Sequence, residues 1–94
     1  MPTFLVEYTF TPSTASTRDD ARPAHRAWLS DLLDNGDLLA SGPYTDGLGA
    51  LLIFRAADED AVKAILAEDP YVPVAAIDAT TVTEWTPVFG PITD

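Results

Sequence analysis

Residues 50–54, ALLIF, are apolar at every position. Successive side chains of a β-strand point to opposite faces of a sheet, so a strand of this composition is apolar on both faces. Leu51 and Ile53 fall on one face, and the other three side chains fall on the opposite face. The sequence therefore predicts a strand inside a sheet that is covered on both sides.

The chain up to Gly36 predicts one strand and one helix. Alternation in residues 3–10, TFLVEYTF, predicts a strand. A polar loop follows, after which Asp19 or Asp20 is placed to cap a helix that has Pro23 in its first turn. Gly36 provides the left-handed residue that ends this helix.

The chain after Gly36 predicts three strands and one more helix. Asp58 is placed to cap the helix at residues 59–68. Pro70 ends this helix, because proline disfavours helical geometry at Asp69 and has no N–H to donate. The predicted strands cover residues 37–44, 50–56 and 76–88.

The order of these elements is strand, helix, strand, strand, helix, strand. This order predicts an α+β fold of the ferredoxin-like type, a βαββαβ plait with an antiparallel sheet and both helices on one face. The helices cover only one face of the sheet, whereas residues 50–54 are apolar toward both. A second copy of the chain is the simplest cover for the other face, and we therefore expect a homodimer.

Length and composition narrow the functional classes. The 94 residues predict one small domain, residues 1–94, with a C-terminal tail from about residue 87. Because the sequence has no Cys and a single His, we expect no metal site and no cofactor. The net charge of −10 argues against nucleic acid and membrane surfaces as partners. With no apolar run of about 20 residues and no signal peptide, we expect a cytoplasmic protein.

His25 is the only side chain whose ordinary change of charge lies near neutral pH. Helical spacing places it on the same face as Trp28, Leu29 and Leu32, at the edge of the core. Near the start of the predicted helix, the helix dipole favours the neutral imidazole, which is the form that acts as a base. The alternative is a histidine that closes the edge of the core through a hydrogen bond to the backbone.

Asp69 stands at the predicted C-terminus of the second helix, where the helix dipole disfavours an acid by up to about 1 kcal/mol. The two helices of a plait pack side by side in opposite directions, so the end of the second approaches the start of the first. We therefore expect Asp69 to contact His25 and to orient its imidazole. The alternative is an acid that is merely held by the turn at Pro70.

Arg18, Arg22 and Arg26 recur every four residues and make up three of the five basic residues. One interpretation is an anion-binding group at the mouth of a pocket, for which Arg22 is the best placed. The other is a solvated stripe paired with acids such as Asp19 and Asp20, in which each pair contributes less than about 1 kcal/mol.

Residues 41–49, SGPYTDGLG, contain glycines without the spacing of a phosphate-binding loop, and no predicted helix follows them. The pattern is typical of a hairpin. Ser41 and Tyr44 are candidate hydroxyl donors to a bound molecule, and the backbone at Gly42 and Pro43 is a candidate pocket wall.

Four motifs occur along the chain in the order RPAHRAWL, NGDLLASGPY, DGLGALLIF and EDPYV. Together they resemble the YCII-related family of small dimeric α/β-barrel proteins, over roughly residues 3–86. The resemblance implies a ferredoxin-like dimer with a pocket in each subunit and a catalytic His–Asp pair, which here matches His25 and Asp69. An activity associated with the family removes halide from a small hydroxylated aromatic ring. The loop before the first helix and Pro23 depart from the family's common form at the mouth of the expected pocket.

Two functional hypotheses follow. The first is a small-molecule enzyme in which His25, oriented by Asp69, transfers protons in lyase, isomerase or hydrolase chemistry. The second is a non-catalytic dimeric module that binds a small ligand or has a regulatory role. The candidate substrate-binding residues are Arg22, Ser41, Gly42, Pro43 and Tyr44.

Overall fold

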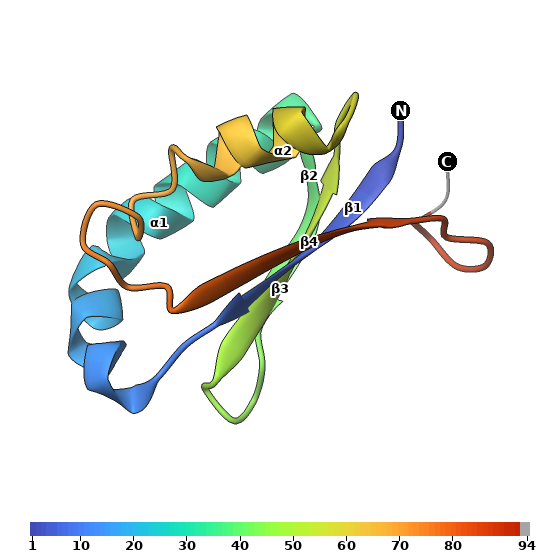
Figure 1. The fold of residues 1–94 in the computed structure, drawn as a ribbon. Coiled ribbons are helices and arrows are strands. Elements are labelled where there is room, and N and C mark those ends of the chain that lie inside the picture. The colour runs from blue at the N-terminus through green and yellow to red at the C-terminus, as the bar shows by residue number, and fades with distance from the viewer. Residues whose placement is uncertain (93–94) are drawn as a thin grey trace.

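A four-stranded antiparallel sheet forms the body of the protein, and two helices lie on one of its faces (Figure 1). The computed structural model describes residues 1–92. Within these residues, neither helix combines the length and hydrophobicity that crossing a membrane requires. The elements in chain order are β1 (Thr3–Thr9), the 3₁₀ turn η1 (Pro12–Thr14), α1 (Ala15–Asn35), β2 (Leu38–Pro43), β3 (Gly49–Arg55), α2 (Glu59–Leu66) and β4 (Ala79–Trp85).

The strands lie in the order β2-β3-β1-β4. The predicted ferredoxin-like βαββαβ plait is therefore confirmed. The core lies between the sheet and the helices, where alternate residues of β1 and β3 and the apolar side of α2 are buried. The most deeply buried members of this core are Phe4, Val6, Tyr8, Leu38, Leu52, Phe54, Ala56, Val62, Tyr71 and Ala76.

The face of the sheet that carries no helix in the described chain is called the outer face below (Figure 1). On this face Leu5 of β1 lies beside Ile53 of β3, and Glu7 lies beside Leu51. The three apolar side chains are only half-buried, and Trp85 of β4 is 37% exposed. The strand β3 is therefore apolar on both faces, as its sequence predicts, and the described chain covers only one of them.

The first helix is longer than the sequence predicts. It begins at Ala15 rather than after Asp19 or Asp20, and Pro23 lies in its interior rather than in its first turn. Proline has no N–H to donate to the carbonyl four residues earlier, and its ring crowds that carbonyl. Figure 1 shows α1 changing direction along its length, and Pro23 accounts for this bend.

The early turns of α1 are held by Arg18, which the surface-stripe interpretation placed in solvent. Arg18 is only 6% exposed. Its guanidinium donates to the backbone oxygens of Thr11 at 3.1 Å and Ala76 at 3.3 Å, and also to the hydroxyl of Thr14. It lies over the ring of Phe10, 4.3 Å from the ring centroid. These tertiary contacts explain why the helix begins earlier than the local sequence indicates.

The second helix begins as predicted but ends earlier. The Asp58 carboxylate accepts a hydrogen bond of 2.8 Å from the backbone N–H of Ala61, which is the predicted cap. The helix ends at Leu66, and the N–H of Asp69 donates to the carbonyl of Leu66 in the turn that follows. The prediction that the helix extends to residue 68, with Asp69 at its C-terminus, was therefore wrong. Asp69 lies beyond the last helical turn, within which the dipole effect falls off.

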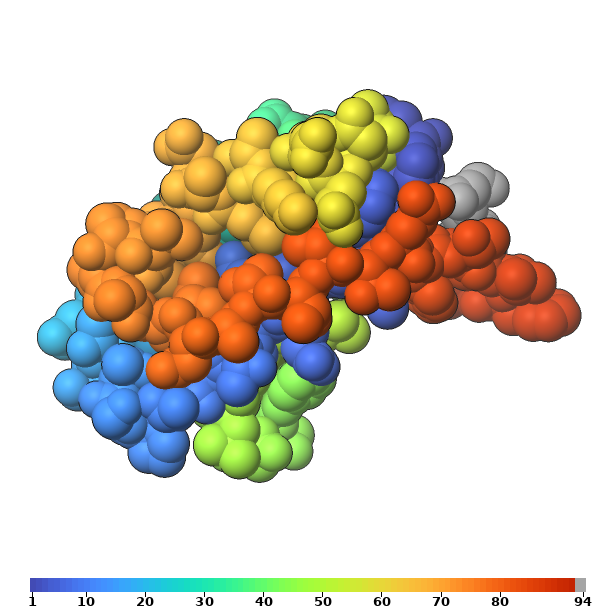
Figure 2. Space-filling model, viewed as in Figure 1, coloured from blue at the N-terminus to red at the C-terminus, as the bar shows by residue number. Residues whose placement is uncertain are grey.

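The last strand ends at Trp85, before the predicted limit at residue 88. The described residues that follow it project from the body of the molecule (Figure 2). Val88 is 71% exposed and Phe89 is 94% exposed. The described part of the predicted tail thus carries apolar side chains into solvent.

Gly49, at the start of β3, has no room for a side chain. A Cβ atom at this position would lie 2.4 Å from the backbone oxygen of Tyr8 and 3.1 Å from the ring of Tyr44. The backbone oxygen cannot swing aside as a side chain would, so the strands would have to separate locally. Gly42 in the neighbouring strand has open space around the same position.

We expect Gly49→Ala to lower the free energy of unfolding by about 1–3 kcal/mol, because the added methyl group overpacks the pair of strands. Gly42→Ala is the matched control and should change it by about 0.5 kcal/mol or less. Urea denaturation followed by circular dichroism measures both variants. Equal stability of the two would contradict the close approach at Gly49.

Candidate active site

His25 of α1 and Asp69 of the segment after α2 are in direct contact. The Nδ1 atom of His25 lies 2.8 Å from Oδ1 of Asp69. The Asp69 side chain is completely buried, and 13% of the His25 side chain remains exposed. The predicted contact between imidazole and carboxylate is present, although 44 residues separate the two in the sequence.

Asp69 accepts hydrogen bonds from three parts of the chain. Besides His25, the backbone N–H of Tyr71 donates to Oδ1 at 2.9 Å, and the hydroxyl of Tyr8 donates to Oδ2 at 2.7 Å. Burying a carboxylate is costly unless its oxygens are hydrogen-bonded, and here both oxygens are. Since a carboxylate only accepts, Nδ1 of His25 carries a hydrogen, and in the neutral imidazole Nε2 carries the lone pair.

The Nε2 atom of His25 is accessible. It has no hydrogen-bond partner in residues 1–92, whereas every fully buried side-chain nitrogen or oxygen of those residues has one. An imidazole held by a carboxylate at one nitrogen and open at the other is arranged to exchange a proton at the open nitrogen.

Two aromatic rings fix the plane of the imidazole. The ring of Tyr71 is stacked on His25, with centroids 3.9 Å apart and planes 8° apart. The ring of Trp28 lies 5.8 Å away on the same helix. Together with the Asp69 hydrogen bond, these contacts restrict both the position and the rotation of the imidazole.

His25 does not lie near the start of a helix, because α1 begins at Ala15. The expectation that the helix dipole acts on this imidazole was therefore wrong, since the dipole effect falls off within the first turn. The hydrogen bond from Nδ1 to Asp69 determines the tautomer instead.

Sequence reasoning missed Tyr8 as part of this site. Alternation in β1 assigned it to the core, and no local signal links it to Asp69, which lies 61 residues away. Burial, and then the charge and hydrogen bond of Asp69, raise the pKa of Tyr8. The phenol therefore stays protonated and remains a donor to Asp69 through the neutral pH range.

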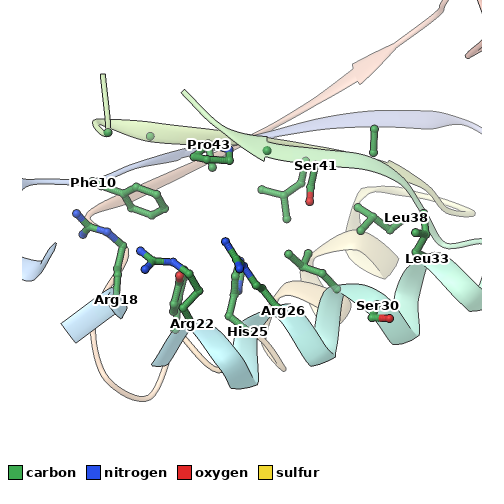
Figure 3. Close-up of a pocket in the computed structure, with 18 of the residues that line it drawn as sticks. Phe10, Arg18, Arg22, His25, Arg26, Ser30, Leu33, Leu38, Ser41 and Pro43 are labelled. Carbon is green, nitrogen blue, oxygen red and sulfur yellow. The ribbon is translucent and has the colours of Figure 1, made fainter. Parts of the chain in front are cut away.

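A cavity of about 920 Å³ opens between α1 and the strands β2 and β3 (Figure 3). His25 and Tyr71 belong to its lining. Ligand pockets in proteins span about 300–1,000 Å³, so the cavity has room for a small metabolite. Within the described residues, no three His, Asp or Glu side chains gather closely enough to hold a metal ion.

The residues predicted to bind substrate separate into two groups. Arg22, Ser41, Gly42 and Pro43 line the cavity, whereas Tyr44 does not. The Tyr44 ring lies over Gly49 on the outer face, where its hydroxyl donates to Glu7. The expectation for Tyr44 fails because the chain turns after Pro43, which carries this ring to the other side of the sheet.

The three arginines of α1 all line the cavity. Arg22 also pairs with Asp19 at 2.8 Å, as the surface-stripe interpretation expected. Its hydrogen bond to Asp19 raises the pKa of Arg22. The arginines therefore line a pocket, as the anion-binding interpretation expected, and Arg22 is paired with a surface acid, as the surface-stripe interpretation expected.

Comparison with protein families agrees with this geometry. The sequence model of the YCII-related domain matches residues 2–86. The chain belongs to the YCII-related family. No curated protein sequence gives a significant match.

Solved structures share the fold of this YCII-related chain. A 5-chloro-2-hydroxyhydroquinone dehydrochlorinase from Burkholderia phenoliruptrix AC1100, in complex with 2,5-dihydroxybenzoquinone, aligns with 98% of this chain and 99% of its own, at 28% identity and a TM-score of 0.78. An antibiotic biosynthesis monooxygenase aligns with 94% of this chain and 99% of its own, at 18% identity and a TM-score of 0.60. A protein from Agrobacterium tumefaciens aligns with 99% of this chain and 100% of its own, at 12% identity and a TM-score of 0.64. The fold is that of the dimeric α/β-barrel proteins.

We expect Tyr8→Phe to lower the free energy of unfolding of the YCII-related protein by about 1–3 kcal/mol, because the buried Oδ2 of Asp69 loses its donor. Tyr44→Phe is the matched control, since it removes a tyrosine hydroxyl from the Glu7 carboxylate, which is exposed in the single chain, and it should have a smaller effect. Chemical denaturation of both variants at neutral pH measures the difference. Equal losses in the two variants would contradict the role of the buried hydrogen bond.

The wild type and Tyr8→Phe should also differ in how their thermal stability changes at alkaline pH. Because the fold raises the pKa of Tyr8 above the ordinary value of about 10, the contribution of this phenol is fully present below that pH and is lost as the pH rises above it. The thermal midpoint of the wild type should therefore fall more steeply above about pH 10 than that of Tyr8→Phe. Parallel curves would contradict this expectation.

Proposed function

We propose that this YCII-related protein is a small-molecule enzyme in which His25 acts as general acid and base, with its imidazole oriented by Asp69. One observation carries the proposal: Nδ1 is bonded to a buried carboxylate, while Nε2 is accessible in a residue that lines a cavity of about 920 Å³. This arrangement supplies the two requirements of proton-transfer catalysis, a basic atom and a space for the substrate beside it.

In the proposed reaction, the lone pair of Nε2 takes a proton from a C–H or O–H group of the substrate or, in a hydrolysis, from the attacking water molecule. The imidazolium that forms stays hydrogen-bonded to Asp69, whose negative charge stabilises it. The proton then returns to a leaving group or to another atom of the product. Lyase, isomerase and hydrolase reactions all fit this sequence, and similarity to a dehydrochlorinase at 28% identity favours the lyase class.

The substrate is proposed to lie between α1 and the strand β2. Arg22 extends from α1, and Ser41 and Pro43 extend from β2 toward the same space (Figure 3). The Ser41 hydroxyl is a donor or acceptor for a polar group of the substrate, and Gly42 belongs to the same wall of the cavity.

The test is a turnover screen with small hydroxylated aromatic compounds and small organic acids, including 5-chloro-2-hydroxyhydroquinone. Substrate loss and product formation are followed by liquid chromatography with mass spectrometry. For any compound that the wild type converts, His25→Gln should lower kcat by about 10²–10⁴, because a positioned proton-transfer group contributes that much.

Lys63→Gln is the control for this screen, since Lys63 pairs with Glu59 on the exposed side of α2, away from the cavity. It should keep full activity. Full turnover by His25→Gln would contradict the enzyme proposal. Binding of compounds with no conversion by the wild type would support the non-catalytic ligand-binding module instead.

We also propose that two copies pack through their outer faces. The support is the apolar row formed by Leu5, Leu51 and Ile53, which the described chain leaves partly exposed, with Trp85 beside it. A monomer in water would keep this row hydrated, whereas a symmetric pair buries it on both chains at once.

Sedimentation equilibrium at micromolar concentration should give twice the chain mass of 10.1 kDa. Ile53→Glu should shift the protein to the monomer, because association would bury a charge in the centre of the outer face. Val72→Glu is the matched control, because Val72 is 49% exposed beside α2. The Val72→Glu protein should remain a dimer. A monomeric wild type would overturn this proposal.

A further inference from the structure

Positive charge in this acidic protein is concentrated on one wall of the cavity. The chain carries a net charge of −10 and has only five basic residues, of which three line this one space. They are Arg18, Arg22 and Arg26, on successive turns of α1. In the described lining the only acidic side chain is that of Asp19. The cavity is therefore cationic inside a strongly anionic molecule.

The three guanidinium groups differ in what already binds them. Arg18 is buried and bonded to Thr14 and to two backbone carbonyls, so its charge is fixed at the cavity wall. Arg22 is paired with Asp19. Arg26 has no ion pair or hydrogen bond with any residue of the described chain. One guanidinium thus has all its donors available to a ligand, and two others add positive potential beside it.

The other end of the cavity is apolar. Leu29 and Leu33 follow His25 along α1 at intervals of one helical turn, and Leu38 and Leu52 lie across from them on the strands. Figure 3 shows the arginines toward one end of the space and Leu33 and Leu38 toward the other, with His25 beside Arg26. Leu33 is 54% exposed although it is a large apolar residue, which leaves an uncovered apolar surface inside the cavity.

From this arrangement we infer that the site takes an amphiphilic monocarboxylic acid, with its carboxylate on Arg26 and its apolar body against Leu29 and Leu33. The inference rests on the proposed function, because it names the substrate class of the same cavity. A guanidinium binds a carboxylate through two parallel N–H donors, which fixes orientation as well as position. The proton that His25 transfers then belongs to an atom close to the acid group.

A neutral ligand of the same shape lacks this interaction. It would leave the Arg26 donors unpaired and would gain nothing from the potential of Arg18 and Arg22. Matched acids and amides differ in charge while their apolar bodies are the same. They therefore isolate the contribution of the cationic wall from that of the leucines.

The test measures binding rather than turnover. Wild-type protein is titrated with phenylacetate against phenylacetamide, and with hexanoate against hexanamide, by calorimetry or by amide NMR shifts. Each acid should bind at least about tenfold more tightly than its amide. Added salt should lower the affinity for the acids and leave the affinity for the amides unchanged. Arg26→Gln should remove most of the preference for the acid, because the paired N–H donors are lost and only the potential of Arg18 and Arg22 remains.

Two variants separate this inference from the enzyme proposal. Lys63→Gln removes one positive charge outside the cavity and should keep the preference for acids. His25→Gln should also keep it, since the carboxylate is held by Arg26. Equal binding of acids and amides by the wild type, no binding of either acid at millimolar concentration, or an undiminished acid preference in Arg26→Gln would each overturn the inference. Loss of turnover in His25→Gln tests the proton-transfer role independently of all these outcomes.

Discussion

The buried carboxylate of Asp69 is the interaction on which the arrangement of this protein depends. It joins Tyr8 of β1, His25 of α1 and the backbone of Tyr71 in the segment after α2. A carboxylate removed from water is tolerated only when donors replace its hydration, so these three elements must meet at one point. The same requirement that stabilises the carboxylate therefore also places the imidazole.

The helix α1 is attached to the rest of the fold at several points along its length. Arg18 ties its first turns to Thr11 and Ala76, and His25 ties its middle to Asp69. Leu32 packs into the core near its C-terminal end. Between these attachments the bend at Pro23 and the small residues of β2 leave space for the cavity. A long helix that bends over a sheet edge thus provides both the support for His25 and the wall of the site.

The two faces of the sheet differ in composition and in what covers them. The helix-facing side contains the core and, at the β2–β3 end, the cavity with its cationic wall. The outer face has an apolar row across β1 and β3 and a polar pair between Tyr44 and Glu7. The proposed association uses the outer face and the proposed ligand site uses the helix-facing side, so the two proposals do not require the same residues.

Local sequence determined most of the fold, because its signals act over a few residues. Alternation placed β1 and β3, Asp58 capped α2, and Gly36 ended α1 in a left-handed conformation. The ferredoxin-like order also predicted the contact between His25 and Asp69, although the structure forms it between the middle of α1 and the segment after α2. The division into a single domain of residues 1–94 stays a prediction.

What local sequence did not determine depended on contacts between distant residues. The start of α1 followed from the burial of Arg18 against Thr11 and Ala76, which outweighs the cost of an internal Pro23. The third donor to Asp69 came from Tyr8, and the turn after Pro43 moved Tyr44 to the outer face. Only the folded chain decided these features, because the free energy of a buried charge or an extra helical turn depends on groups that are remote in sequence and adjacent in space.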